Sequence, residues 1–241
     1  MKRRKRLRRT SRAQSRRSSR VSRVSYPPSK ESMRQLLKRS GIKVPPAKLA
    51  KLWKFHQLFF QRQLVLDLSR IRNFENVVIK HYVDSLLVRQ LISLPSPLLD
   101  IGTGAGFPGI PIKIFSPGLE IILAEKRSRR VRFLEEANRR LELGAQIYPH
   151  RVSSTYFGPP VRGVITRALE SIDRTLGRVY AFLPRGGKAI FMKGPDSQGE
   201  VELACEKFSH RFRLIQNQFY SIPHTSHRRT LVVFERLVGE A

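Results

Sequence analysis

The stretch from residue 97 to 111, P-L-L-D-I-G-T-G-A-G-F-P-G-I-P, constrains the fold of this chain more than any other. The apolar run at 98–101 leads directly into glycines at 102, 104, 106 and 109, and prolines stand at 108 and 111. This order is typical of a strand, a tight loop and the first turn of a helix. Because glycines let a ligand approach the main chain, we predict a doubly wound α/β fold with a ligand at this loop.

Two classes of ligand use such a loop. The glycines match G-x-G-x-x-G from position 104, and Glu125 lies where a dinucleotide site has an acid for the ribose hydroxyls. Asp100, two residues before the first glycine, favours the other class, because its carboxylate repels a pyrophosphate but attracts the amine and sulfonium of S-adenosylmethionine. We therefore predict an S-adenosylmethionine site that includes Asp100, Gly102, Gly104 and Gly106. A dinucleotide site and a glycine turn without a ligand are the alternatives.

The chain is strongly basic, with 47 Lys and Arg against 18 Asp and Glu in 241 residues and a formal net charge of +29. Such a charge indicates a polyanionic partner, and a small-molecule substrate alone would not require it. Residues 1–30 contain no acid and almost no large apolar side chain, so we predict a disordered basic tail. The tail is equally consistent with an RNA-binding arm, an organelle transit peptide or an incorrectly assigned start, since Met33 directly precedes a helical segment.

The rest of the chain is long enough for one main core with a small extension. We predict an N-terminal helical lobe at 31–95 and an S-adenosylmethionine-binding Rossmann-like domain at 96–241. Cys205 is the only cysteine, and no apolar run approaches the roughly 18 residues of a membrane span, so we expect a cytoplasmic protein without a membrane partner. We also expect a monomer. His224 and His227 have no carboxylate or cysteine nearby to complete a site, so we predict no metal.

A seven-stranded, mostly parallel sheet is predicted from seven apolar segments. These segments are 98–101, 120–124, 145–148, 163–166, 187–192, 212–220 and 230–235. The carboxyl ends of parallel strands line the ligand crevice, so Glu125, the pair at 152–153 and Arg167 are expected to face the ligand. Helical periodicity is predicted from Met33, at 49–64, at 74–91, for a short stretch ending near 116, and at 128–143.

Three of the predicted helices carry side chains of interest. The apolar face at 49–64, which includes Phe59, Phe60 and Leu64, is interpreted as packing for the helical lobe. His81 and Asp84 share one face of the helix at 74–91, where a polar contact between helix and sheet is favoured over substrate binding. The arginines at 128–143 are equally consistent with a solvated face and with a surface that contacts RNA.

Several motifs together resemble a known family. They are D-I-G-T-G-A-G-F-P-G-I-P at 100–111, E-K-R-S-R-R-V-R-F-L at 125–134, H-Y-V-D-S-L at 81–86, T-R-A at 166–168, M-K-G at 192–194 and R-T-L-V-V at 229–233. Over about residues 33–237 the chain resembles ribosomal RNA small subunit methyltransferase G, formerly called glucose-inhibited division protein B. The resemblance implies transfer of a methyl group from S-adenosylmethionine to N7 of one guanine in 16S rRNA, either naked or in an assembling small subunit.

The family resemblance also implies particular site residues. The donor contacts would be Gly102, Phe107, Val152, Ser153 and Arg167, and Glu125 matches the acid after the second strand. The chain departs from the family pattern in two places. Ser153 stands where the family often has an acid, and Asp67, Leu68 and Ser69 stand where it usually has Asn-Leu-Thr. The basic tail has no counterpart in the family.

The chemistry of guanine N7 limits the roles that protein groups can play. N7 has a lone pair and no proton to lose, so its attack on a sulfonium methyl needs no general base, and we predict none. Alignment of the reacting atoms can supply on the order of 7 kcal/mol of the barrier. We expect Lys193, Arg167 or a backbone amide to hold O6, with Arg167 assigned to the donor or a phosphate in preference to the base. Phe107 is expected either to stack on the guanine or to pack in the core.

The predicted RNA contacts are Arg129, Arg130, Lys193 and Arg229. Two other functions fit part of this pattern. One is a nucleic-acid-binding protein whose donor site is vestigial, with the basic tail and the arginine-rich helix as its functional parts. The other is a small-molecule enzyme, either a methyltransferase or an NAD-dependent enzyme, against which the net charge of +29 argues.

Overall fold

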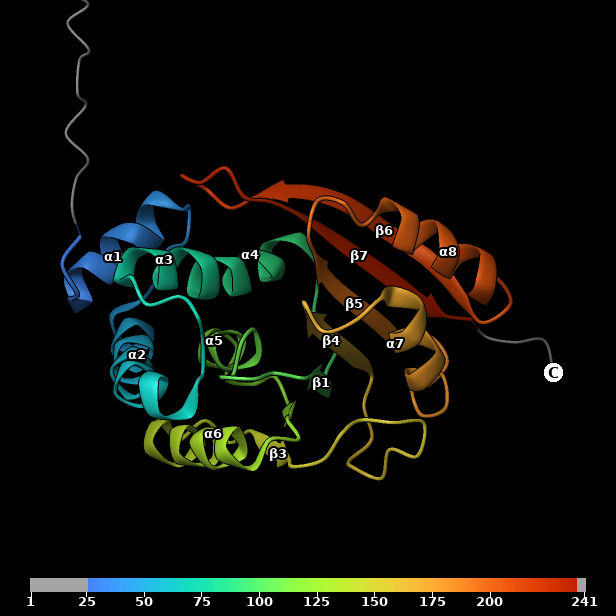
Figure 1. Cartoon of the computed structure of the whole chain (residues 1–241), viewed down its shortest axis with the longest axis horizontal. Helices are drawn as coiled ribbons and strands as arrows, with labels where there is room; N and C mark the ends of the chain where they lie inside the picture. The colour runs from blue at the N-terminus through green and yellow to red at the C-terminus, as the bar shows by residue number, and fades with distance from the viewer. Residues whose placement is uncertain (1–25, 238–241) are drawn as a thin grey trace, which may run out of the picture.

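One sheet of seven strands forms the centre of the computed structural model, which describes residues 26–237 (Figure 1). Its strand order is β3-β2-β1-β4-β5-β7-β6. The strands are β1 (Leu98–Ile101), β2 (Ile121–Ala124), β3 (Gln146–Tyr148), β4 (Gly163–Arg167), β5 (Lys188–Lys193), β6 (Phe212–Ser221) and β7 (Arg228–Arg236). The pairs among β1 to β5 are parallel, and β7 pairs antiparallel with both β5 and β6. The predicted α/β fold with a mostly parallel seven-stranded sheet is therefore confirmed.

Helices cover both faces of the sheet (Figure 1). They are α1 (Lys30–Arg39), α2 (Pro46–Leu66), α3 (Phe74–Val77), the π-helical segment η1 (Val78–Val83), α4 (Asp84–Leu91), α5 (Gly109–Phe115), α6 (Ser128–Leu141), α7 (Ile172–Val179) and α8 (Gln198–Phe208). Residues of α1 to α6 share one core cluster, and residues of α7 and α8 share another. Neighbouring residues of a strand enter different clusters, as Ile121 and Ile122 do, because side chains alternate across a sheet.

The N-terminal helices pack directly on the sheet domain. Phe55 of α2 contacts Phe107 and Phe133, at ring-centroid distances of 5.4 and 6.2 Å, so the predicted lobe and the sheet share one hydrophobic core. The predicted buried face of α2 is wrong in part, because Phe60 is 59% and Leu64 is 71% exposed. Helix α2 is covered along the stripe that includes Phe55 and Phe59, since only that side faces α5, α6 and η1.

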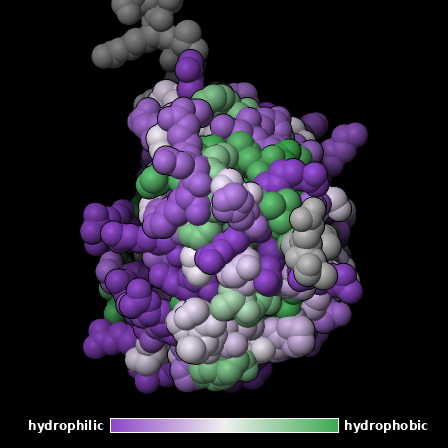
Figure 2. Space-filling model, turned by 90° about the vertical axis from the view of Figure 1, so that its right-hand side faces the viewer, coloured by the Kyte–Doolittle hydropathy of each residue, from purple (hydrophilic) through white to green (hydrophobic). Residues whose placement is uncertain are grey.

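Three further features complete the fold. The helix predicted at 74–91 is continuous but contains the π-helical segment η1. Helices α7 and α8 were not predicted from the sequence; their side of the molecule is largely hydrophilic, with separate hydrophobic patches (Figure 2). Within residues 26–237, none of the helices is long and apolar enough to cross a membrane. Residues 1–25 of the predicted tail lie outside the part of the chain that the structure describes. Ser29, near the end of that predicted tail, caps α1 by accepting a hydrogen bond from the Ser32 amide at 3.0 Å.

Candidate functional site

The glycine loop follows β1, beside the point where the strand order reverses between β1 and β4. In open α/β sheets the ligand crevice lies at such a point, outside the carboxyl ends of the strands. Gly104 and Gly106 have φ values of +61° and +87°, which place the chain in the left-handed region that glycine adopts at little cost. Gly109 is required for another reason, because a Cβ there would lie 2.3 Å from Leu123 Cδ2. The loop therefore needs glycine both for its turn and for its contact with β2.

Asp100 holds the two ends of this loop together through hydrogen bonds. Its Oδ2 accepts hydrogen bonds from Thr103 Oγ1 at 2.6 Å and from the Gly109 amide at 2.8 Å. The side chain is fully buried, and its Oδ1 has no hydrogen-bond partner among residues 26–237. Burial raises the pKa of the Asp100 carboxyl to about 6, although both hydrogen bonds oppose the rise. Asp100, which is predicted as a contact to the donor, is absent from the lining of the pocket at this loop, and its two hydrogen bonds hold the loop in shape.

A pocket of about 390 Å³ opens beside the loop at the carboxyl ends of β1, β2 and β4. Gly102, Glu125 and Val152, which were predicted as donor contacts, all line it. Glu125 Oε1 accepts a hydrogen bond from the Arg127 amide at 2.9 Å, and its Oε2 lies 3.9 Å from Arg130 Nη1. These contacts hold the carboxylate at the end of β2. The arrangement matches the one expected for an acid that binds ribose hydroxyls.

Leu169 forms part of the pocket wall. Its Cδ1 lies 2.6 Å from the point where a Cβ on Gly102 would stand, so Gly102 leaves the space that this side chain needs. Glu170 follows Leu169 in the wall and pairs with Arg178 at 2.7 Å. Ala168, which precedes Leu169, has a φ of +50°, and the backbone therefore turns sharply as it leaves β4. The pocket is thus bounded on the β4 side by a short loop attached to α7 through an ion pair.

Arg167 and Phe107 lie outside the pocket lining and pack against each other. The Arg167 guanidinium carbon lies 5.6 Å from the centroid of the Phe107 ring. Arg167 also contacts Asp84 Oδ2 at 3.4 Å and His81 Nδ1 at 3.2 Å. Phe107 is 5% exposed among the aromatic rings of α2 and η1, which supports core packing as its role.

His81 is a structural partner of Arg167 that the sequence indicated only as a polar contact between helix and sheet. An arginine can only donate hydrogen bonds, so His81 Nδ1 must be the acceptor, and Nε2 carries the proton. Nε2 then donates to Ser69 Oγ at 2.9 Å, and the imidazole ring stacks on Phe107 with centroids 4.7 Å apart. Burial, together with the charge of Arg167, lowers the pKa of His81 to about 3, so the ring is neutral. The three-residue spacing of His81 and Asp84 was the signal that could have revealed this cluster.

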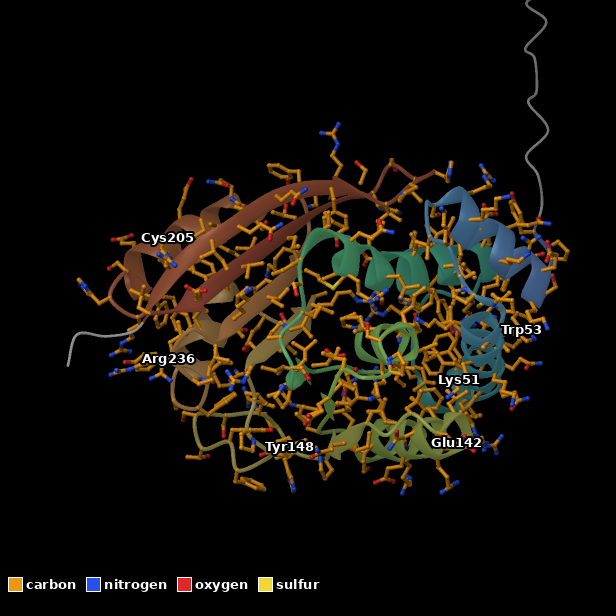
Figure 3. All side chains as sticks on the ribbon, turned by 180° about the vertical axis from the view of Figure 1, so that it is seen from behind. Lys51, Trp53, Glu142, Tyr148, Cys205 and Arg236 are labelled. Carbon is orange, nitrogen blue, oxygen red and sulfur yellow. The ribbon has the colours of Figure 1, made fainter. Side chains whose placement is uncertain are left out.

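The remaining predicted site residues are dispersed. Ser153 lies outside the pocket lining, and its hydroxyl is hydrogen-bonded to that of Thr155 at 2.9 Å. Gly104 and Gly106 shape the loop but are also absent from the lining. The edge strand β3 ends at Tyr148, at the opposite side of the sheet from β6 (Figure 3).

The four predicted RNA contacts have different surroundings. Arg129 is exposed in the first turn of α6. Arg130 lines the pocket and donates to the Asp67 carbonyl at 2.9 Å, while Arg229 lies 3.5 Å from Asp84. Lys193 Nζ contacts Glu200 at 2.7 Å and donates to the Glu170 carbonyl at 2.9 Å. Three of the four cations are therefore already engaged by groups of the protein itself.

The doubly wound sheet, with its glycine loop and an acid at the end of β2, defines a Rossmann-like α/β protein with a ligand crevice at that loop. A crystal structure of a SAM-dependent O-methyltransferase from Thermotoga maritima has the same fold, with a TM-score of 0.51 and 11% identity over 76% of this chain and 72% of that one. The chain belongs to the rRNA small subunit methyltransferase G family, whose family model matches residues 48–232. The resemblance inferred from the sequence is thereby confirmed.

Two relatives show how far the similarity extends. Ribosomal RNA small subunit methyltransferase G 2 of Syntrophobacter fumaroxidans is 49% identical over 210 residues, which are 87% of this chain and 42% of the relative. The protein of the same name in Bdellovibrio bacteriovorus is 40% identical over 193 residues, which are 78% of this chain and 73% of the relative. The chain thus spans less than half the length of the Syntrophobacter protein but most of the Bdellovibrio protein.

Proposed function

We propose that this protein transfers a methyl group from S-adenosylmethionine to N7 of a guanine in small-subunit rRNA. The observation that carries the proposal is the pocket at the glycine loop, in which Gly102 and Glu125 meet at the switch point of the sheet. Membership of the rRNA small subunit methyltransferase G family supports the substrate class. The high net charge of +29 supports a polyanionic substrate as well. We further propose that the protein acts as a cytoplasmic monomer.

The residues of the pocket suit S-adenosylmethionine. Glu125 is positioned to accept hydrogen bonds from the ribose hydroxyls, and Gly102 leaves its main chain open to the ligand. Val152 supplies an apolar wall, while Ser153 can contribute only through its backbone or after a rearrangement of its loop. When bound, this donor supplies a methyl group bonded to a positively charged sulfur. No protein carboxylate is needed to activate that group.

Arg167 is proposed as a positioning residue for the donor site. Its guanidinium is anchored by Asp84, His81 and Phe107, so the end of β4 and the helical layer are tied together beside the glycine loop. A cation held in this way does not press on the acceptor nitrogen. That arrangement suits the reaction, because the guanine gains positive charge as its N7 is methylated.

The remaining catalytic demand falls on alignment of the acceptor. Guanine N7 attacks without losing a proton, so the protein must bring N7, the methyl carbon and the sulfur into line. The exposed Arg129 at the start of α6 is proposed to contact an RNA phosphate near the pocket. Arg130 and Arg229 are proposed to contribute to the positive field around the pocket, since their ion pairs leave them less free to bind RNA directly.

Incubation with methyl-labelled donor and small-subunit rRNA from cells lacking this modification tests the proposal. We expect the label in 7-methylguanine, identified by mass spectrometry of the digested RNA, and we expect Gly102→Ala to abolish it. A wild-type protein that binds the RNA but transfers no label to guanine would contradict the proposal. That result would favour a nucleic-acid-binding protein with a vestigial donor site.

A further inference from the structure

A second pocket, of about 240 Å³, lies at the carboxyl ends of β4 and β5 and at the start of α8. It is lined by Ala168, Lys193, Gly194, Asp196, Ser197 and Glu200, among others. Ala168 also lines the first pocket, so the two pockets meet at the residue that follows β4. A group bound in the second pocket would therefore lie next to a donor bound in the first.

Ser197 gives this pocket an unsatisfied hydrogen-bonding group. It precedes α8 at the position of an N-cap, yet its side chain makes no capping hydrogen bond. The residue is 3% exposed, and its Oγ has no hydrogen-bond partner within residues 26–237. Such an atom is costly to bury, and a ligand that accepts its hydrogen bond would remove the cost.

The two carboxylates of the pocket differ in their availability. Glu200 Oε2 is bound by Lys193 Nζ at 2.7 Å and by the Ile172 amide at 3.0 Å. Asp196 is exposed, and no other residue in the described part of the chain binds its carboxylate. One lysine against two carboxylates leaves the pocket with net negative charge, which disfavours a phosphate. The chemistry instead suits a neutral ligand with hydrogen-bond donors for Asp196 and an acceptor for Ser197.

The Watson–Crick edge of guanine has this pattern, with N1–H and the N2 amino group beside the acceptor O6. We propose that the second pocket binds the guanine to be methylated, with the Asp196 carboxylate accepting from N1–H and N2–H and the Ser197 hydroxyl donating to O6. Proteins that act on an unstacked base commonly bind it along this edge. N7 takes no part in these contacts and stays free to attack the methyl group. Adenine fits less well, because its N1 is an acceptor and would face the carboxylate. The inference rests on the proposed function.

The assignment of the second pocket to guanine is tested by changing the protein and the RNA separately and together. Inosine lacks the N2 amino group of guanine but keeps N7, so it is placed at the methylated position of a synthetic rRNA fragment. We expect the wild type to methylate the inosine RNA about tenfold more slowly than the guanine RNA, as measured by kcat/KM. Asp196→Asn keeps one acceptor oxygen, which is enough for N1–H, so it should lose about tenfold on guanine RNA but little further on inosine RNA, where the N2 contact is already absent. Ser197→Ala should slow both RNAs alike.

Matched controls separate this assignment from the proposed function. Glu202→Gln changes a carboxylate of α8 that bonds Gln198 at 2.9 Å and does not line the pocket, so it should behave as wild type. Asp196→Asn should bind S-adenosylhomocysteine as tightly as the wild type does. Two results would overturn the assignment but leave the proposed function standing. One is that inosine lowers kcat/KM by the same factor in the wild type and in Asp196→Asn. The other is that Asp196→Asn methylates guanine RNA at the wild-type rate. A wild type that labels no guanine would overturn the proposed function as well.

Discussion

Asp100 shows how a single buried carboxylate can fix the shape of a glycine loop through its hydrogen bonds. The two hydrogen bonds to its Oδ2 join the end of β1 to Thr103 and to the start of α5. Its other oxygen has no partner among the described residues, so ionisation in the folded protein is costly. Asp100 therefore fixes the conformation of the glycine loop but lowers the stability of the folded protein near neutral pH.

The first prediction concerns the pH dependence of that cost. Burial raises the pKa of Asp100 from 3.8 to about 6, so the folded state holds a proton that the unfolded state releases between those values. Stability from this group is therefore lost as pH rises through that interval. Between pH 4.5 and 7.5 the wild type should lose about 2 kcal/mol of unfolding free energy relative to Asp100→Asn. Denaturant unfolding of both proteins at the two pH values measures this difference, and an unchanged difference would contradict the prediction.

His81 should show the opposite dependence on pH. Burial and the neighbouring Arg167 lower the pKa of His81 from 6.5 to about 3, so the unfolded state takes up a proton that the folded state resists. Stability from this group is present above pH 6.5 and is lost as pH falls. The wild type should therefore weaken relative to His81→Asn as pH is lowered from 7 to 5. Parallel denaturant titrations of the two proteins measure the effect.

The hydrogen bond between His81 and Arg167 can be separated from the packing of the ring. His81→Ala removes the acceptor from Arg167 and the stack on Phe107, which should cost about 1–3 kcal/mol or more of unfolding free energy at pH 8. Asn at position 81 keeps an acceptor in place of Nδ1 and should cost less. Equal losses for the two variants would show that the hydrogen bond does not contribute.

At the scale of elements, the glycine loop tolerates substitution differently at each position. A Cβ at Gly104 would lie no closer than 3.4 Å to any neighbour, with Arg130 Nη1 at that distance and the Gly102 carbonyl at 3.9 Å, but the residue must adopt a φ of +61°, which costs about 1–2 kcal/mol. An alanine at Gly109 would stand 2.3 Å from Leu123 Cδ2 and 2.7 Å from Asp100 Oδ2, both in the core. We therefore expect Gly109→Ala to lower the free energy of unfolding more than Gly104→Ala, as measured by denaturant titration. The reverse order would contradict this view of the loop.

The same scale explains what the sequence could and could not predict. The central strands were predictable because buried strands are continuous apolar runs bounded by turn residues, as at 163–167. Helix α7 was missed because it is short and contains Thr175 and Gly177, which weaken a helical pattern. The sequence placed Glu125 correctly at the end of β2. It could not show that Asp100 is bound by Thr103 and Gly109 and is absent from the pocket lining, since those contacts form only in the folded loop.

At the scale of the whole molecule, the positive charge and the two adjacent pockets act together. Charge brings a polyanion to the protein at long range but does not discriminate between bases, which short-range hydrogen bonds must do. Many basic side chains at the site are engaged by carboxylates, as Lys193 is by Glu200 and Arg167 by Asp84. Much of the electrostatic attraction must therefore come from cations elsewhere, and the basic N-terminal segment is the richest source in the sequence.

Deletion of residues 2–25 tests whether the basic N-terminal segment supplies the long-range attraction for RNA. The segment carries only basic charges, and the deletion leaves the Ser29 cap of α1 and the contact between Tyr26 and Arg39 intact. Each lost phosphate contact should reduce the slope of log K against log salt by about 0.7–0.9, so we expect weaker RNA binding with a shallower slope. Binding of labelled rRNA at several salt concentrations measures the slope, and S-adenosylhomocysteine affinity should not change. An identical slope in the truncated protein would show that the segment does not contact RNA and that the folded body alone supplies the attraction.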